Sequence, residues 1–394
     1  MEEKDFLSSR MKINIGPAHP ATHGTLHFKM ELEGEKIARC EPVIGYLHRA
    51  FEKSAEKGTY TQVIPYTDRL NYCSSMINNV GYVLAVERLM GIDVPERCKY
   101  IRVIISELSR IMDHLVCIGA TAVDVGALTN FWYFFEKREE IYEILEQLCG
   151  ARLTTSYTRV GGLMRDAGPE FETGVRTLLA SVPRALDDVD ALLKKNRIFF
   201  DRSHDVGRIS KEDAIAYSFT GPCLRASGVA YDVRKASPYL VYDRFAFEVP
   251  TETDGDAYAR YLVRMAEMRE SLKIVGQAID ALPGGPVNSD DHRVTLPEKQ
   301  KVYNEMEALI RQFKIIIEGV RPEPGETYFA VEGANGELGF YIVSDGTMNP
   351  YRVRVRPPCF PFLAAFPKMV EGAYLADAIS TLSSLNIIAG ELDR

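Results

Sequence analysis

The 394-residue chain lacks the features that mark export and membrane insertion. No apolar segment follows a positively charged N-terminal stretch, and no apolar run reaches the roughly 18 residues of a spanning helix. Lysine and arginine are also scarce relative to aspartate and glutamate, 47 against 55, so the formal net charge is -8. Without excess positive charge to neutralise phosphates, nucleic acid is not an expected partner. We expect the chain to fold in the cytoplasm.

Cysteine pairs suited to metal binding are missing too. The seven cysteines include no C-x-x-C pair, which disfavours a zinc or iron–sulfur site. An odd number of cysteines without an export signal also disfavours a disulfide framework. We therefore expect reduced, mostly buried thiols, and we assign any cluster that the protein works with to a partner. The cysteines are Cys40, Cys73, Cys98, Cys117, Cys149, Cys223 and Cys359.

Phosphate-binding glycine loops and internal repeats are absent as well. No P-loop occurs, and no G-x-G-x-x-G motif follows a predicted strand; the glycine clusters at 161–162 and 333–336 are typical of turns. The sequence has no repeat and no low-complexity tract, which excludes a solenoid or a disordered scaffold. We therefore expect no nucleotide binding by this chain.

The chain does contain enough apolar material for a substantial core. Hydrophobic residues make up 46% and charged residues 26% of the sequence, as is ordinary for a folded protein. Apolar and polar side chains alternate over 11–43 and again over 328–331 and 338–343, the pattern of half-buried strands. Helical spacing runs from 78 to 116 and recurs near 136–149, 170–195, 258–283 and 299–317. The sequence therefore predicts an α+β fold: a central helical bundle with an N-terminal antiparallel sheet and C-terminal strands.

Proline and glycine punctuation, together with these patterns, indicates how the chain is divided. We expect a flexible tail at 1–10, a β-rich N-terminal domain at 11–77, a helical core at 78–325 and a C-terminal α+β segment at 326–394. The length suits two or three packed units.

Two histidines stand in a turn-forming stretch near the N-terminus, GPAHPATHG at 16–24. Proline fixes φ and glycine admits positive φ, so this stretch predicts a defined loop that can aim a side chain. Because histidine titrates near neutral pH, His19 and His23 are candidates for proton donors or metal ligands. The alternative is that both rings only hydrogen-bond the loop together, and spacing alone does not decide between the two.

Three further segments combine polar and aromatic residues in ways that folding alone does not require. They carry Arg49, then Arg69 with Tyr72, and then Asp124, which is followed by an aromatic run at 131–135. Taken singly, each charged residue also fits a solvated surface or a structural ion pair, and the aromatic residues also fit a core. The four segments together are more informative about function than any single residue in them.

This combination closely resembles one family of respiratory complex I (NADH:quinone oxidoreductase) proteins. In bacteria the family is called the D subunit, and it is homologous to the large subunit of nickel–iron hydrogenases. The resemblance extends from about residue 11 to the last residue and implies a hydrogenase-large-subunit-like fold. The matching motifs are GPAHPATHG (16–24), IGYLHR (44–49), FEK (51–53), YTDRLNY (66–72), DVGALT (124–129), RVGG (159–162), LRASG (224–228), YDVRK (231–235), GELG (336–339), VSDG (343–346), PYR (350–352) and GELDR (390–394).

The resemblance implies a quinone-reducing pocket at the contact with a partner that carries the terminal [4Fe–4S] cluster. His23 and Tyr72 match the residues that contact and protonate the quinone headgroup, and Asp124 matches the acid paired with that histidine. Arg49 and Arg69 match arginines on the cluster side of the pocket. The substrate is then ubiquinone or menaquinone, and this chain alone holds no cofactor and no metal.

The implied partners are the iron–sulfur B subunit of complex I, its C subunit, other peripheral-arm subunits and the membrane arm. The chain is then expected on the cytoplasmic side of the cell membrane, attached through these partners, in an enzyme that oxidises NADH on other chains and pumps protons. Because its interfaces are covered by partners, we expect the isolated chain to expose apolar patches and aggregate.

The sequence departs from related proteins at two points. Thr154 stands where many family members have a histidine near the cluster, so we expect a low cluster potential that is insensitive to pH and suited to menaquinone. Hydrogenases hold nickel and iron with paired cysteines, whereas this chain has Asn71, Ser74 and the C-terminal GELDR. Without thiolates that soft-metal site cannot form, which excludes a nickel–iron hydrogenase.

Two other functions remain open at this point. The chain could be a structural scaffold in a ferredoxin- or hydrogenase-linked membrane complex, with its pocket unused. It could also be a metal-dependent hydrolase that uses His19, His23 and Asp124, although no H-E-x-x-H-like spacing supports this.

Overall fold

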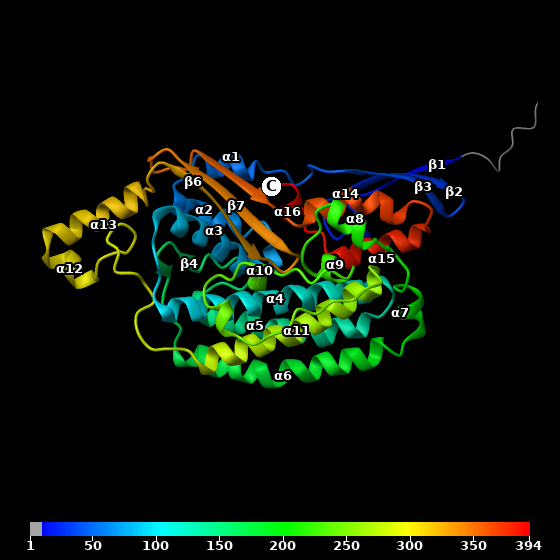
Figure 1. Ribbon diagram of the computed structural model, residues 1–394, viewed down its shortest axis with the longest axis horizontal. Coiled ribbons are helices and arrows are strands. Elements are labelled where there is room, and N and C mark those ends of the chain that lie inside the picture. The colour runs from blue at the N-terminus through cyan, green and yellow to red at the C-terminus, as the bar shows by residue number, and fades with distance from the viewer. Residues whose placement is uncertain (1–9) are drawn as a thin grey trace, which may run out of the picture.

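The computed structural model describes residues 10–394, so the tail predicted at 1–10 lies outside the described residues except for Arg10. Long helices form a bundle along one side of the molecule, and small antiparallel sheets lie across it (Figure 1). The predicted α+β class is therefore confirmed. Within residues 10–394, no helix is both long enough and apolar enough to cross a membrane.

The N-terminal sheet has the order β1-β2-β3 and is antiparallel throughout, as predicted. Alternate residues of β2 are buried, and Phe28 packs on Phe366 of α14 with ring centroids 4.9 Å apart. The histidine loop joins β1 to β2 and contains the 3-10 turn η1. The bounds are β1 Met11–Ile15, η1 Pro20–Thr22, β2 His27–Glu33 and β3 Lys36–Val43.

The bundle is built around α4, which packs against α3, α5, α11 and α15. Almost every side chain of α4 is buried, including polar ones, because neighbours surround it on all sides. The predicted helices are confirmed with shifted ends: α5 begins at 128 rather than 136. The bounds are α3 Ser75–Met90, α4 Glu96–Asp124, α5 Leu128–Cys149, α6 Pro169–Leu193 and α11 Ala257–Asp280.

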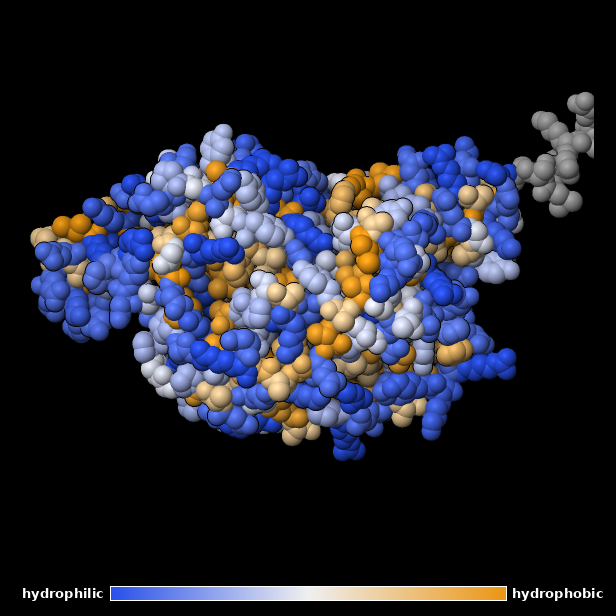
Figure 2. All heavy atoms as spheres, viewed as in Figure 1, coloured by the Kyte–Doolittle hydropathy of each residue, from blue (hydrophilic) through white to orange (hydrophobic). Residues whose placement is uncertain are grey.

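The predicted helix at 299–317 is wrong in one respect, because it is two helices. Glu305 has an extended backbone (φ −123°, ψ 124°) that separates α12 Lys299–Asn304 from α13 Met306–Glu318. The pair projects from the body of the molecule (Figure 1), and hydrophobic residues gather at its outer end (Figure 2). One face of α13 is apolar and exposed.

The second large sheet has the order β6-β7-β8 and packs on α3. β6 and β7 match the predicted strands, whereas β8 was not predicted because its RVRVR sequence is short and rich in arginine. Three helices follow and pack against one another and the N-terminal sheet. The bounds are β6 Gly325–Glu332, β7 Glu337–Ser344, β8 Arg352–Arg356, α14 Cys359–Val370, α15 Leu375–Leu385 and α16 Ala389–Leu392.

Short elements connect these layers. They are α1 Phe51–Ala55, α2 Tyr60–Thr67, η2 Tyr72–Ser74, β4 Thr158–Arg159, β5 Gly162–Leu163, α7 Arg197–Asp201, α8 Lys211–Ala216, α9 Gly221–Arg225, α10 Val233–Ala236 and η3 Tyr242–Arg244.

Two large hydrophobic clusters form the core. One fills the helical bundle and the underside of the β6-β7-β8 sheet. The other joins the N-terminal sheet to α14, α15 and α16, so the two ends of the chain share a core. The division into residues 11–77, 78–325 and 326–394 stays a prediction.

Candidate functional site

The histidine loop is held in one conformation by short-range hydrogen bonds. The Nδ1 of His19 accepts from the backbone N–H of Ala21 at 3.2 Å, and the buried Thr22 hydroxyl lies 2.8 Å from both the His19 and Gly24 carbonyls. His23 follows with a left-handed backbone (φ 53°). His19 therefore helps to bond the loop together and is exposed, whereas the His23 ring is left to point out of it.

His23 and Asp124 meet although 101 residues separate them in sequence. The Nε2 of His23 lies 2.8 Å from Oδ2 of Asp124, and the side chains are 29% and 15% exposed. Asp124 is the last residue of α4, and the loop that carries His23 packs on α15. The Nδ1 of His23 makes no hydrogen bond with any residue from 10 to 394, so it can face a ligand.

Ser383 completes this group, and the sequence analysis missed it. Its hydroxyl, on the buried face of α15, forms a short hydrogen bond to the same Asp124 Oδ2 and also lies 3.0 Å from the Ile379 carbonyl. Serine is common in helices and its partner is 259 residues away, so the sequence holds no signal beyond the hydroxyl-rich STLSS run at 380–384.

Tyr72 begins η2 and is 37% exposed. The side chain of Asn71 fixes this turn by accepting from the Cys73 N–H at 3.1 Å and donating to Oδ2 of Asp113 at 2.7 Å. Burial, and then the nearby Cys73 and Asp113, raise the pKa of Tyr72, while Arg138 opposes the shift. The phenol is therefore neutral near pH 7 and can donate a proton in a hydrogen bond.

One face of α4 links Tyr72 to the His23–Asp124 pair. Asp113 lies beside the η2 turn, and Asp124 is the last residue of the helix. The two aspartates are eleven residues apart, which puts them on nearly the same face of α4 and about 16 Å apart along its axis. No hydrogen bond joins the His23 and Tyr72 rings within the described part of the chain. The structure thus brings His23 and Asp124 together. Tyr72 lies in η2, which packs against an earlier part of α4.

Arg49 and Arg69 lie next to each other in space, beside the C-terminal segment of the chain. The Arg49 guanidinium donates to the backbone carbonyls of Arg69 at 3.2 Å and Gly390 at 3.5 Å. Partial burial and the positive charge of Arg69 lower the pKa of Arg49, and Asp393 opposes the shift. A Cβ on Gly390 would lie 2.4 Å from the Arg69 carbonyl, so the closing GELDR motif packs tightly on this loop. Both arginines are exposed.

Thr154 lies in a segment that is bonded to the start of α3. The Ser75 hydroxyl donates to the Leu153 carbonyl at 2.6 Å and lies 3.2 Å from the Thr155 hydroxyl. Ser75 is three residues after Tyr72, so half-buried Thr154 belongs to the surroundings of the Tyr72 turn.

Buried Glu391 is a second group that the sequence analysis missed. Its carboxyl accepts from the Cys359 N–H at 3.0 Å, and burial raises the pKa of Glu391 to about 7. The sequence did mark this residue, because Glu391 belongs to the GELDR motif. Its raised pKa depends on burial, which the sequence does not show.

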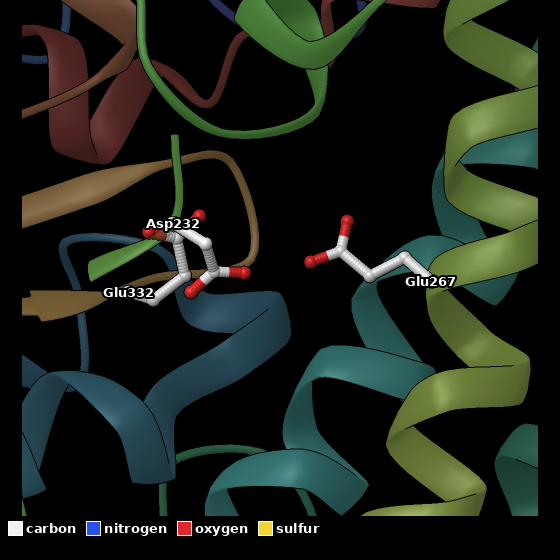
Figure 3. Close-up of side chains that lie close together, drawn as sticks. All are labelled: Asp232, Glu267 and Glu332. Atoms are coloured by element: carbon white, nitrogen blue, oxygen red, sulfur yellow. The ribbon is translucent and has the colours of Figure 1, made fainter. Parts of the chain in front are cut away.

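Three buried carboxylates also lie close together elsewhere, but arginine side chains fill the space between them. Oxygens of Asp232, Glu267 and Glu332 lie within 4.8 Å of one another (Figure 3). The Arg225 guanidinium donates to Glu267 at 2.9 Å and to Glu332 at 2.8 Å, which supplies the positive charge that a metal would bring. Among residues 10–394 this is the one such group of three potential ligands, so His19, His23 and Asp124 do not converge as a metal site.

Large hydrophobic side chains are exposed on the segments that carry the site residues and on the neighbouring start of α5. Each of them is at least one-third exposed: Ile44, Tyr46, Tyr66, Tyr72, Val123, Leu128, Trp132, Tyr133 and Leu153. Exposed apolar side chains gathered near charged groups are typical of surfaces that other proteins cover.

Comparisons with known proteins agree on one family. The family model for the respiratory-chain NADH dehydrogenase, 49 Kd subunit, matches residues 124–394. The D subunit of NADH-quinone oxidoreductase from Leptospira biflexa is 53% identical over 390 residues, 99% of this chain and 96% of its own length. The C/D subunit of the Bdellovibrio bacteriovorus enzyme is 53% identical over 391 residues, 99% of this chain and 70% of its own length. The first D subunit of the Sorangium cellulosum enzyme is 51% identical over 393 residues, 100% of this chain and 97% of its own length.

Proposed function

Because the chain belongs to the family of the 49 kDa subunit of respiratory-chain NADH dehydrogenases, we propose that it forms the site where that enzyme reduces quinone. The chain acts as the D subunit, one component of a multisubunit NADH:quinone oxidoreductase. The observation that carries the proposal is the contact between His23 Nε2 and Asp124 Oδ2 at 2.8 Å.

The His23–Asp124 pair suits the chemistry of quinone reduction. Two-electron reduction places negative charge on the carbonyl oxygens, and N–H or O–H donors aimed at those oxygens stabilise it as it develops. In the doubly protonated ring, Nε2–H faces the Asp124 carboxylate and Nδ1–H is left to donate to the headgroup. This partly exposed ring then acts as the proton donor to one carbonyl.

Tyr72 supplies the second donor in this proposal. Its phenol is neutral near pH 7 because burial raises its pKa, and its turn is fixed by Asn71. A neutral phenol donates once, so it must be reprotonated after each turnover. The headgroup would lie along the face of α4 that leads from the Tyr72 turn to Asp124.

Electrons reach the quinone from a [4Fe–4S] cluster of the partner, the iron–sulfur B subunit. The cysteines of this chain are free thiols, and all but half-buried Cys149 are buried, so they offer no ligand set for such a cluster. The exposed Arg49 and Arg69 are candidates to face it, since nearby positive charge favours the reduced state. With Thr154 in place of a histidine, we expect a pH-insensitive cluster potential suited to menaquinone; a steep slope in a redox titration would contradict this.

The apolar surface around the site supports contact with other subunits. We assign it to the iron–sulfur B subunit, with further peripheral-arm subunits and the membrane arm completing the assembly on the cytoplasmic side of the membrane. The Bdellovibrio bacteriovorus relative is named for both C and D, which supports the C subunit as another partner. The substrate in this proposal is a ubiquinone or a menaquinone.

The test uses the assembled enzyme in membranes with His23→Ala or Tyr72→Phe. We expect quinone reduction to fall by about 100-fold or more, because a positioned proton donor contributes on that order. Co-purification of the other subunits and electron transfer from NADH to an artificial acceptor should stay at the wild-type level. If both variants reduce quinone at the wild-type rate and affinity, the site is elsewhere and the scaffold function gains support.

A further inference from the structure

One oxygen of Asp124 contacts two side chains from different parts of the chain. Both His23 Nε2, from the N-terminal loop, and the Ser383 hydroxyl, from α15, contact Oδ2. The second acceptor near the Ser383 hydroxyl is the Ile379 carbonyl, 3.0 Å away on its own helix. A serine hydroxyl has a single proton, so Ser383 donates to one of these acceptors at a time.

The position of Asp124 in the fold makes the hydrogen bond from the Ser383 hydroxyl important. Asp124 is the last residue of α4, where the helix dipole disfavours negative charge. An anionic carboxylate at that end needs compensating partners, and among residues 10–394 the side chains of His23 and Ser383 contact it. Removing the Ser383 hydroxyl takes one of these two contacts away from the carboxylate.

Helix α15 is anchored so that Ser383 has little freedom. The next residue, Ser384, is bonded through its carbonyl to Arg264 at 2.7 Å and through its hydroxyl to Arg260 at 2.9 Å. Both arginines are buried on α11, and Ser383 itself is 2% exposed. The hydroxyl is therefore fixed against Asp124 by the bundle rather than by contacts within the loop.

Other titratable groups lie where α4, α11 and α15 meet. Cys117 contacts the Ser383 carbonyl from α4 and is a neutral thiol, since burial raises its pKa to about 11. Asp113 of α4 is bonded to Asn71 and Asn386, and Arg264 of α11 to Ser384. Within residues 10–394, none of these three makes a hydrogen bond or ion pair with Asp124, which leaves His23 and Ser383 as its partners.

We propose that Ser383 is a positioning residue that keeps Asp124 anionic and oriented toward His23, and so keeps the His23 ring charged and aimed at the quinone. This inference rests on the proposed function, which it extends to a residue on α15. When Asp124 is an anion, the hydroxyl donates to Oδ2; when Asp124 gains a proton, the hydroxyl turns to the Ile379 carbonyl.

The experiment measures the pH dependence of quinone reduction by the assembled enzyme. Activity requires the Asp124 anion, so the rate falls toward acid pH. In Ser383→Ala the carboxylate loses a donor, and the acid limb should move to higher pH by about one unit. Ser383→Thr keeps the hydroxyl and should restore the wild-type limb. Asp124→Asn removes the titrating carboxyl, so it should lower the rate at every pH and abolish the acid limb.

The matched control is Ser380→Ala, which removes another buried hydroxyl from the same helix without touching Asp124. Its pH profile should match that of the wild type. If Ser383→Ala prevents assembly, Ser383→Cys preserves the volume, replaces a strong donor by a weak one and should show the same shift.

The outcomes separate this inference from the proposed function. If Asp124→Asn impairs quinone reduction while Ser383→Ala and Ser383→Cys leave the acid limb unmoved, the role of Ser383 is wrong and the proposed site stands. A uniform loss of rate shared with Ser380→Ala, without a shifted limb, overturns it too. If His23→Ala and Asp124→Asn also behave like wild type, the proposed function itself fails.

Discussion

A single buried carboxyl group near the C-terminus should make stability depend on pH in an unusual direction. Burial raises the pKa of Glu391 to about 7 from an ordinary value of 4.5. Below about pH 4.5 the group is protonated in both the folded and unfolded states and costs nothing. Between about pH 4.5 and pH 7 unfolding releases a proton, so folded-state stability falls over this range and levels off above pH 7.

Glu391→Gln removes this titration and keeps an acceptor for the Cys359 N–H. The variant should therefore gain stability relative to the wild type between pH 5 and pH 8, by about 2 kcal/mol in the free energy of unfolding. Denaturant unfolding of the purified chain at the two pH values measures the gain. Glu35→Gln, at an exposed turn, is the control and should show no such gain. An equal pH dependence in wild type and Glu391→Gln would contradict the raised pKa.

At the scale of single residues, the sequence predicted which side chains lie in contact only where both belong to a recognisable motif. The resemblance implied that Asp124 pairs with His23, and in the structure His23 Nε2 lies 2.8 Å from Asp124 Oδ2. Ser383 and the titration of Glu391 could not be found in this way. Both depend on contacts between distant parts of the chain, which composition and spacing do not encode.

At the scale of elements, a buried ion network fastens the sheet to the bundle. Four carboxylates and three guanidiniums, all fully buried or nearly so, join α4, α9, α10, α11 and β6, and His114 bonds to Glu267 at 3.2 Å. The members are Glu107, Asp232, Glu267, Glu332, Arg110, Arg225 and Arg234. Arg225 holds α9 to both α11 and β6, so much of the network depends on it.

Arg225→Met should destabilise the fold strongly, because it removes the guanidinium that contacts both Glu267 and Glu332 in the interior. Breaking such a buried pair costs about 3–5 kcal/mol. The free energy of unfolding in denaturant, or the yield of folded chain where the loss is complete, measures this. Arg176→Met is the matched control, since exposed Arg176 also contacts two carboxylates and its loss should change stability little. Equal effects of the two variants would contradict the structural role.

Periodicity predicted the long elements well and their ends less well. Apolar spacing identified α6 and α11 to within a few residues, whereas its run from 78 to 116 did not separate α3 from α4 and ended before α4 does. It placed the start of α5 too late, because exposed aromatic residues such as Trp132 interrupt the apolar pattern in its first two turns. It also missed the break at Glu305, where tertiary structure sets an extended backbone within a helical pattern.

At the scale of the whole molecule, the chain carries apolar surface that its own fold does not cover. The projecting α12–α13 pair is one case, with hydrophobic residues visible at its outer end (Figure 2). Side chains at intervals of three and four residues form one apolar face of α13, each about half or more exposed: Met306, Leu309, Ile310, Phe313, Ile316 and Ile317. At about 200 Å² for a large side chain, this face alone presents several hundred Å², which is large for a protein that exists alone.

We therefore expect the isolated chain to self-associate through this face, and the double variant Met306→Lys with Phe313→Lys to reduce that association. The two side chains are 71% and 64% exposed, so they contribute little to folding and the unfolding midpoint should not change. Light scattering over a range of concentrations measures the association. The control, Gln300→Lys with Gln312→Lys, adds the same two charges to these helices and leaves the apolar side chains in place. If the control reduces association equally, net charge rather than the apolar face determines the solubility of the chain.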